Sequence, residues 1–133
     1  MKMSFEEAFK CMKNGGAVKP STWYDDTYMM IDGTDFVDNI GNRTFLSYKE
    51  VIAEWEQVAT IKVGDQLFCR DNDTNKKVFF YIAYAAGRFF AVNVYDENGD
   101  YYVQSHLEWL ENEIKDNYTI VGNWNAKDLM EDC

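Results

Sequence analysis

The 133-residue chain contains one proline, one histidine and three cysteines, and it has no long apolar run. So little proline, together with only eight glycines, excludes collagen-like and low-complexity chains. No stretch approaches the roughly 18 consecutive apolar residues of a membrane span. The first residues also lack the apolar segment of a signal peptide, so we expect a cytoplasmic protein.

The cysteines and the histidine are too few for the common catalytic and metal sites. Cys11, Cys69 and Cys133 are odd in number and scattered, which predicts neither a disulfide framework nor a structural zinc site. We expect Cys11 and Cys69 to be small buried residues. A single histidine argues against most acid–base enzymes, and no nucleophile–base pair can be read. We therefore expect no enzyme, no catalytic residue, no cofactor and no bound metal.

Aromatic residues and acidic charge are abundant. Four Trp, nine Tyr and nine Phe exclude a disordered chain and can supply a hydrophobic core. The formal net charge is −10, and Lys76-Lys77 is the only pair of adjacent basic residues. Because a nucleic-acid binder needs a basic face to neutralise phosphates, we expect no direct nucleic-acid ligand. An acidic surface fits solubility, or binding to a basic groove of a partner protein.

Three capping boxes predict helices over residues 4–14, 47–55 and 105–115. Each box is a serine followed three residues later by glutamate. Each is continued by apolar residues at helical spacing. Gly15-Gly16 ends the first helix, because glycine readily adopts the left-handed conformation found there.

Between the helices the pattern predicts short β-strands. A polar loop is expected over 32–43, and Asn98-Gly99 is a strong hairpin signal. The tail from 125 to 133 is polar. The strands that we expect cover residues 17–19, 27–31, 66–70, 78–84, 88–95, 101–103 and 118–121.

The change of pattern near Thr60 predicts an α+β chain with two modules. Residues 1–60 would form a small helix-plus-antiparallel-sheet module. Residues 61–124 would form a small β-barrel-like module with one inserted helix, and 125–133 would be the tail. A single α+β domain is the alternative.

Few residues match a known chemical motif. Asp71-x-Asp73-x-Asn75 opens like a calcium loop, but Lys76 and Ile82 stand where glycine and glutamate are needed, so a polar turn is expected. His106 is interpreted as an exposed residue in a helix's first turn. The glutamates of the 105–115 helix are interpreted as a solvated face. Glycine-rich phosphate loops and the Gly-x-Ser-x-Gly hydrolase motif are absent from the sequence.

Two segments carry a family resemblance. Residues 4–23, SFEEAFKCMKNGGAVKPSTW, and residues 47–58, SYKEVIAEWEQV, resemble the opening and the ending of a family of small phage and prophage proteins. The opening reads F-E-E-A-L, then K-x-G-K-x-V, basic residues and Trp, and the ending reads D-L-L-A-x-D-W-E-V-V. This is the Thoeris anti-defence 2 family. The resemblance implies a homo-oligomer with pockets between subunits, which sequesters cyclic ADP-ribose-type immune signals without cleaving them.

The resemblance also implies a ligand site. Trp23 matches the family's tryptophan and is the candidate for stacking on the ligand, with Tyr24 beside it. Pro20-Ser21-Thr22 replaces the family's basic residues, so Lys19 and Arg43 are the candidate cations. Trp55 matches a family position too, but its place on an apolar helix face predicts a core role. Residues 61–124 resemble, in style only, a small β-barrel appendage of phage proteins.

The leading hypothesis is therefore a non-enzymatic phage or prophage counter-defence protein in the host-cell cytoplasm. It would bind a nucleotide-derived immune signal, with neither nucleic acid nor membrane as a partner. The alternative is an acidic inhibitor of a basic host defence protein, of the anti-CRISPR or DNA-mimic type. A third possibility is a structural accessory protein of a phage.

Overall fold

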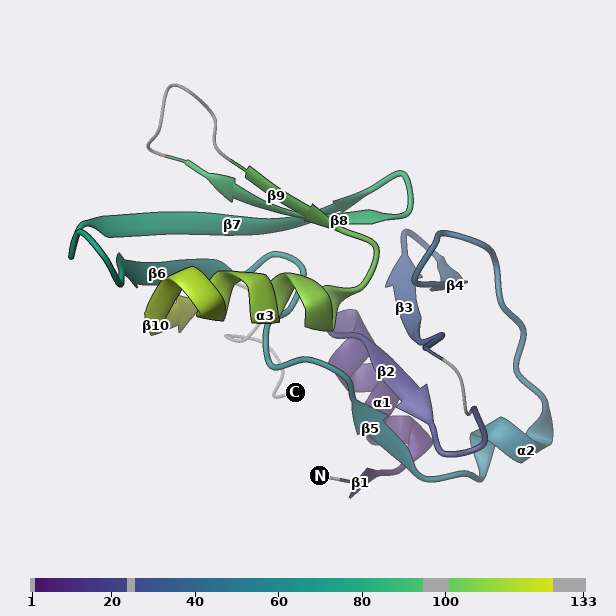
Figure 1. Cartoon of the computed structure of the whole chain (residues 1–133). Helices are drawn as coiled ribbons and strands as arrows, with labels where there is room; N and C mark the ends of the chain where they lie inside the picture. The colour runs from purple at the N-terminus through teal and green to yellow at the C-terminus, as the bar shows by residue number, and fades with distance from the viewer. Residues whose placement is uncertain (1, 24–25, 95–100, 126–133) are drawn as a thin grey trace.

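The computed structural model describes residues 2–23, 26–94 and 101–125, and within them the predicted α+β class is confirmed. Three helices accompany two five-stranded antiparallel sheets (Figure 1). The helices are α1 (Phe5–Lys13), α2 (Tyr48–Val51) and α3 (Leu107–Asn117). No helix in these ranges has the length and apolar character needed to cross a membrane.

The two sheets draw on separate parts of the chain. The first sheet, ordered β1-β5-β2-β3-β4, contains β1 (Lys2–Met3), β2 (Val18–Pro20), β3 (Met29–Asp32), β4 (Asp35–Asp38) and β5 (Trp55–Gln57). The second sheet, ordered β10-β6-β7-β8-β9, contains β6 (Gln66–Asp71), β7 (Lys77–Ala85), β8 (Arg88–Asn93), β9 (Tyr101–Gln104) and β10 (Tyr118–Trp124).

Both halves of the chain contribute to one large core. Its buried residues include Ala17, Tyr28 and Met30 from the first half, and Leu67 and Phe80 from the second. A second, smaller cluster lies between α1 and the first sheet. Thus the two sheets are joined by apolar packing as well as by the chain.

The second sheet is open rather than barrel-like. Its outer strands β9 and β10 pair only with β8 and β6 among the described residues. Helix α3 lies along one side of the sheet, and Figure 1 shows no helix on the other side. The edge strand β10 has a register shift between Ile120 and Gly122, where a bulge interrupts its pairing with β6.

Helix α1 forms as its sequence predicts. The Ser4 hydroxyl accepts a hydrogen bond from the Glu7 amide, and the Glu7 carboxylate accepts one from the Ser4 amide. The helix ends before Gly15, whose φ of +92° favours glycine. Cys11 and Cys69 are buried as expected, but Cys11 is disulfide-bonded, which was not expected. Cys69 is free.

The prediction of a helix over 47–55 is wrong beyond its first turn. The capping box of Ser47 and Glu50 forms, but α2 ends at Val51, and Trp55 lies in β5. Trp55 is nonetheless buried, as its core role requires. The expected polar loop over 32–43 contains β4, which pairs with β3.

The capping box predicted at Ser105 does not form. His106 is the N-cap residue of α3 and makes no side-chain cap bond. The amide of Leu107 instead donates to the hydroxyl of Tyr28, from the first half of the chain. Burial raises the pKa of Tyr28 well above its ordinary value, so this hydroxyl stays neutral.

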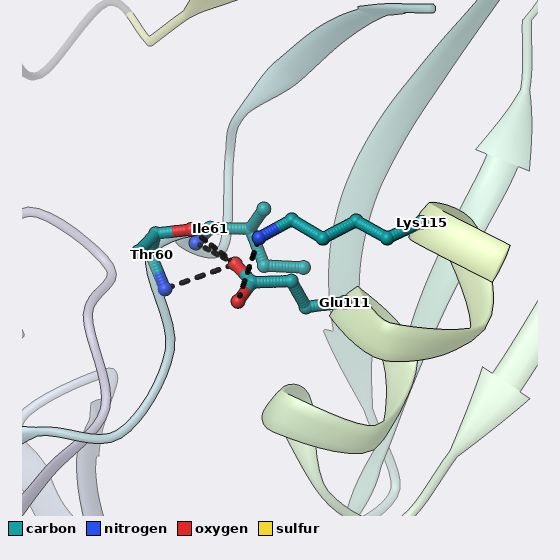
Figure 2. A network of polar contacts seen from close by, with 4 residues as sticks. All are labelled: Thr60, Ile61, Glu111 and Lys115. Atoms are coloured by element: carbon teal, nitrogen blue, oxygen red, sulfur yellow. Dashed lines mark hydrogen bonds and ion pairs between the residues drawn. The ribbon is translucent and has the colours of Figure 1, made fainter. Parts of the chain in front are cut away.

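Glu111 links α3 to the segment between the sheets (Figure 2). Its Oε2 atom accepts hydrogen bonds from the Thr60 amide at 2.9 Å and the Ile61 amide at 2.8 Å, and from the Thr60 hydroxyl. Its Oε1 atom lies 3.6 Å from Lys115 Nζ. The carboxylate is buried, which corrects the prediction that the glutamates of this helix form a solvated face.

Candidate functional site

Two of the predicted ligand residues lie in or near β2: Lys19 is its middle residue, and Trp23 follows its end. Trp23 is half-buried and packs against the smaller core cluster, with its ring centroid 6.5 Å from that of Trp55. Lys19 stands directly opposite Glu56 on β5. Tyr24 lies outside the described residues.

Arg43 is separated from these residues. Its backbone bridges to Val37 on β4, and β3 lies between β4 and β2. With strands spaced by about 4.8 Å, Arg43 is about 14 Å from β2. Its guanidinium forms a 3.0 Å ion pair with Asp35. The structure therefore does not bring Arg43 to Trp23, and no single arrangement of the predicted site residues emerges.

His106 joins the two halves of the chain and is not an exposed first-turn residue. Its Nε2 atom is 3.2 Å from the Asn39 amide nitrogen, and its Nδ1 atom is 3.0 Å from the Ser105 hydroxyl. The ring stacks on Trp109, with 3.8 Å between centroids. These contacts hold the ring in place from both halves, which is a structural role.

A cavity of about 480 Å³ lies at the end of α1. Lys13 and Asp32 bring one charge of each sign to it, and Tyr84 lines it as well. Burial, together with Asp32 and Asp38, raises the pKa of Tyr84, whose enclosed hydroxyl has no hydrogen-bond partner. Because its lining has one cation and one carboxylate, the cavity has no excess of positive charge to bind a phosphate.

The outward face of the second sheet, opposite α3, has a different character. Because side chains alternate along a strand, Phe80 and Ile82 point into the core and Phe79 and Tyr81 point outward. The register then places further aromatic side chains and three cations on this outward face, and none of its strand positions is acidic. All the outward strand positions together are Gln66, Phe68, Arg70, Lys77, Phe79, Tyr81, Ala83, Ala85, Arg88, Phe90, Val92, Tyr101, Val103, Thr119, Gly122 and Trp124.

A first hollow of about 340 Å³ lies on this face between an aromatic pair and a cationic pair. Phe68 and Phe79 are cross-strand neighbours with ring centroids 5.2 Å apart. Arg70 and Lys77 are the next outward pair. Since strands rise about 3.4 Å per residue, the two pairs are about 7 Å apart. Asn75 and Val121 complete the outer lining.

The first hollow is electrostatically suited to an anion. Within the described chain, neither Arg70 nor Lys77 has a carboxylate within ion-pair distance. The nearby turn carboxylate of Asp71 accepts hydrogen bonds from the amides of Asp73 and Thr74, which confirms the polar turn predicted there. Among the described residues no three potential metal ligands come together.

Cys69 also lines the first hollow, but it lies on the core side of β6. Burial raises the pKa of its thiol to about 11, so the thiol is protonated near neutral pH and is not a nucleophile. The hollow thus offers aromatic rings for a planar group and two cations for a phosphate. It also offers the side-chain amide of Asn75 for hydrogen bonding. It has the size and mixed character of a small-ligand site.

Sequence reasoning missed the outward face. In β7 the run KVFFYIAYA is apolar on both sides, which is typical of a strand buried on both faces. Once the turn between β6 and β7 is assigned, the antiparallel register pairs Phe68 with Phe79 and Arg70 with Lys77. That pairing could have indicated the site. No family model, no curated protein and no solved structure matches this chain.

Proposed function

We propose that the protein is a non-enzymatic phage or prophage counter-defence protein. It binds a nucleotide-derived immune signal of the cyclic ADP-ribose type and holds it without cleaving it. The observation that carries the proposal is the first hollow, where Phe68 and Phe79 lie beside Arg70 and Lys77. The immune-signal part rests on the resemblance of residues 4–23 and 47–58 to the Thoeris anti-defence 2 family.

The chemistry of the hollow matches a nucleotide better than other small anions. A nucleobase is planar and stacks on phenyl rings. A phosphate group pairs with guanidinium and ammonium groups through charge-assisted hydrogen bonds. The spacing of about 7 Å between the two pairs allows one ligand to reach both. In the described ranges of the chain, Arg70 and Lys77 have no carboxylate within ion-pair distance and lie on a strand face without acidic positions, which favours an anionic ligand.

The test is calorimetric titration of the purified protein with cyclic ADP-ribose isomers, ADP-ribose and mononucleotides. We expect binding to be weakened at least tenfold by Phe79→Ala and by Arg70→Ala, since each removes a direct contact. Lys49→Ala removes an exposed lysine from α2 and is the charge control, with unchanged binding expected. Chromatography of the recovered ligand should show it intact.

Three outcomes would contradict either the proposed function or the location of its site. Binding lost in Trp23→Ala but unchanged in Phe79→Ala would place the ligand at the site that the resemblance implies. Cleaved ligand would make the protein an enzyme. No binding of any nucleotide, combined with salt-sensitive capture of a basic host protein, would favour the acidic inhibitor.

A further inference from the structure

The outward face continues beyond the first hollow. A second hollow of about 170 Å³ lies on the other side of the Phe68–Phe79 pair, and Gln66, Tyr81 and Val94 line it. The phenyl pair therefore forms a ridge with a hollow on each side. A ligand that stacks one planar group in the first hollow has space for a second planar group about 7 Å further along the strands.

The next row of residues crosses the whole sheet. Cross-strand pairing places Trp124, Gln66, Tyr81, Val92 and Tyr101 side by side, one from each strand. The three aromatic members are 45%, 41% and 60% exposed in that order. Planar, half-exposed rings in one row are stacking platforms for bases, and all bases can use them.

A third aromatic row and a cation complete the face. Phe90 pairs with Ala83 and Val103, and its ring centroid is 6.3 Å from that of Tyr101. Beyond it, Arg88 pairs with Ala85 at the end of β7. The face thus has cations at both ends, and the nine residues from Lys77 to Ala85 span about 27 Å. The surface is a track rather than a closed pocket.

We propose that this outward face binds a short, linear, single-stranded oligonucleotide of about three nucleotides, one per aromatic row. The inference rests on the proposed nucleotide site for its first base and extends it along the sheet. The bases stack on the Phe68–Phe79, Tyr81 and Phe90 rows, and phosphates at the two ends meet Arg70–Lys77 and Arg88.

The net charge sets an upper limit on the length. The net charge of −10 over the whole chain repels a long polyanion, and this repulsion is why the sequence predicts no nucleic-acid ligand. Screening confines that repulsion to about 8 Å at physiological salt, so a ligand within the carboxylate-free face is affected little. Nucleotides beyond the face would meet the acidic surface, so added length should bring no added affinity.

The test is a length series of unlabelled single strands from one to six nucleotides, measured by calorimetry on the full chain. We expect affinity to rise up to about three nucleotides and then to level off. Tyr81→Ala should weaken trinucleotide binding about tenfold to a hundredfold and leave mononucleotide binding unchanged. Tyr81→Phe keeps the ring and should restore it, and Tyr48→Ala, an exposed tyrosine on α2, is the matched control.

The outcomes separate this inference from the proposed function. Mononucleotide binding without any gain from added nucleotides overturns the track and leaves the signal-binding site in place. Trinucleotide binding that depends on Tyr81, with no binding of mononucleotides or cyclic ADP-ribose isomers, supports the track and refutes the signal-binding function. Equal affinity for a duplex of the same sequence also overturns the track, because paired bases cannot stack on the rings.

Discussion

Removing the Glu111 carboxylate should destabilise the protein by breaking the link between α3 and the segment joining the sheets. Ile61 is buried, so its amide gains no water when the carboxylate is lost, at a cost of about 1–3 kcal/mol. Thr60 is exposed, so water can replace the carboxylate as the acceptor of its amide, and the loss of this bond costs about 0.5–1.5 kcal/mol. We expect Glu111→Ala to lower the free energy of unfolding by about 2–4 kcal/mol.

Two further variants separate the hydrogen bonds from the charge. Glu111→Gln keeps an acceptor oxygen for the two amides and should cost about 1 kcal/mol. Lys115→Ala removes only the 3.6 Å ion pair at the helix surface and should cost about 0.3–0.5 kcal/mol.

Urea unfolding followed by far-ultraviolet circular dichroism measures these differences. The slope of the unfolding free energy against urea concentration should be the same in each variant, as two-state unfolding requires. In thermal unfolding, Glu111→Ala should lower the midpoint by roughly 7–14 °C, from an unfolding entropy of about 2.1 cal/mol/K per residue. A loss below about 0.5 kcal/mol, or an equal loss in Glu111→Gln, would refute the role of these hydrogen bonds.

Three other perturbations have defined outcomes. Tyr28→Phe removes the acceptor of the buried Leu107 amide and should cost about 1–3 kcal/mol in urea unfolding, with no loss showing that water replaces the hydroxyl. Gly15→Ala should cost about 2 kcal/mol or more by the same measure, because its Cβ would lie 2.1 Å from the Val63 carbonyl oxygen at a φ of +92°, and a neutral result would contradict that geometry. The pKa of Cys69 is raised from 9.0 to about 11, so the unfolded thiol ionises first and stability should fall between pH 9 and 11 by up to about 2–3 kcal/mol. Cys69→Ala should flatten that fall in a pH series of denaturation midpoints.

Local signals predicted the first helix well because its determinants are local. The capping box of Ser4 and Glu7, the apolar face and the glycine after the helix all lie within the short segment from Ser4 to Gly15. The same helical spacing at Tyr48, Val51 and Trp55 led to a wrong prediction of a helix through residue 55. There the apolar side chains of α2 are exposed and Trp55 belongs to a strand, since pairing of β5 with β1 and β2 outweighs local helix preference.

The candidate site was less predictable because it depends on pairing between strands. Arg70 and Lys77 are seven residues apart, and only the antiparallel register makes them neighbours. Sequence alone also cannot show that one side of β7 lacks a covering helix. His106 was misjudged for a similar reason, because its partner Asn39 is 67 residues away.

The bulge in β10 bears on how the protein behaves at high concentration. β10 is a seven-residue edge strand, and a regular edge of that length is a template on which another chain can add as a further strand. The shift between Ile120 and Gly122 breaks the even spacing of donors and acceptors and increases the local twist. An incoming strand could therefore match only half of the edge at a time, which protects the folded chain from edge-to-edge aggregation.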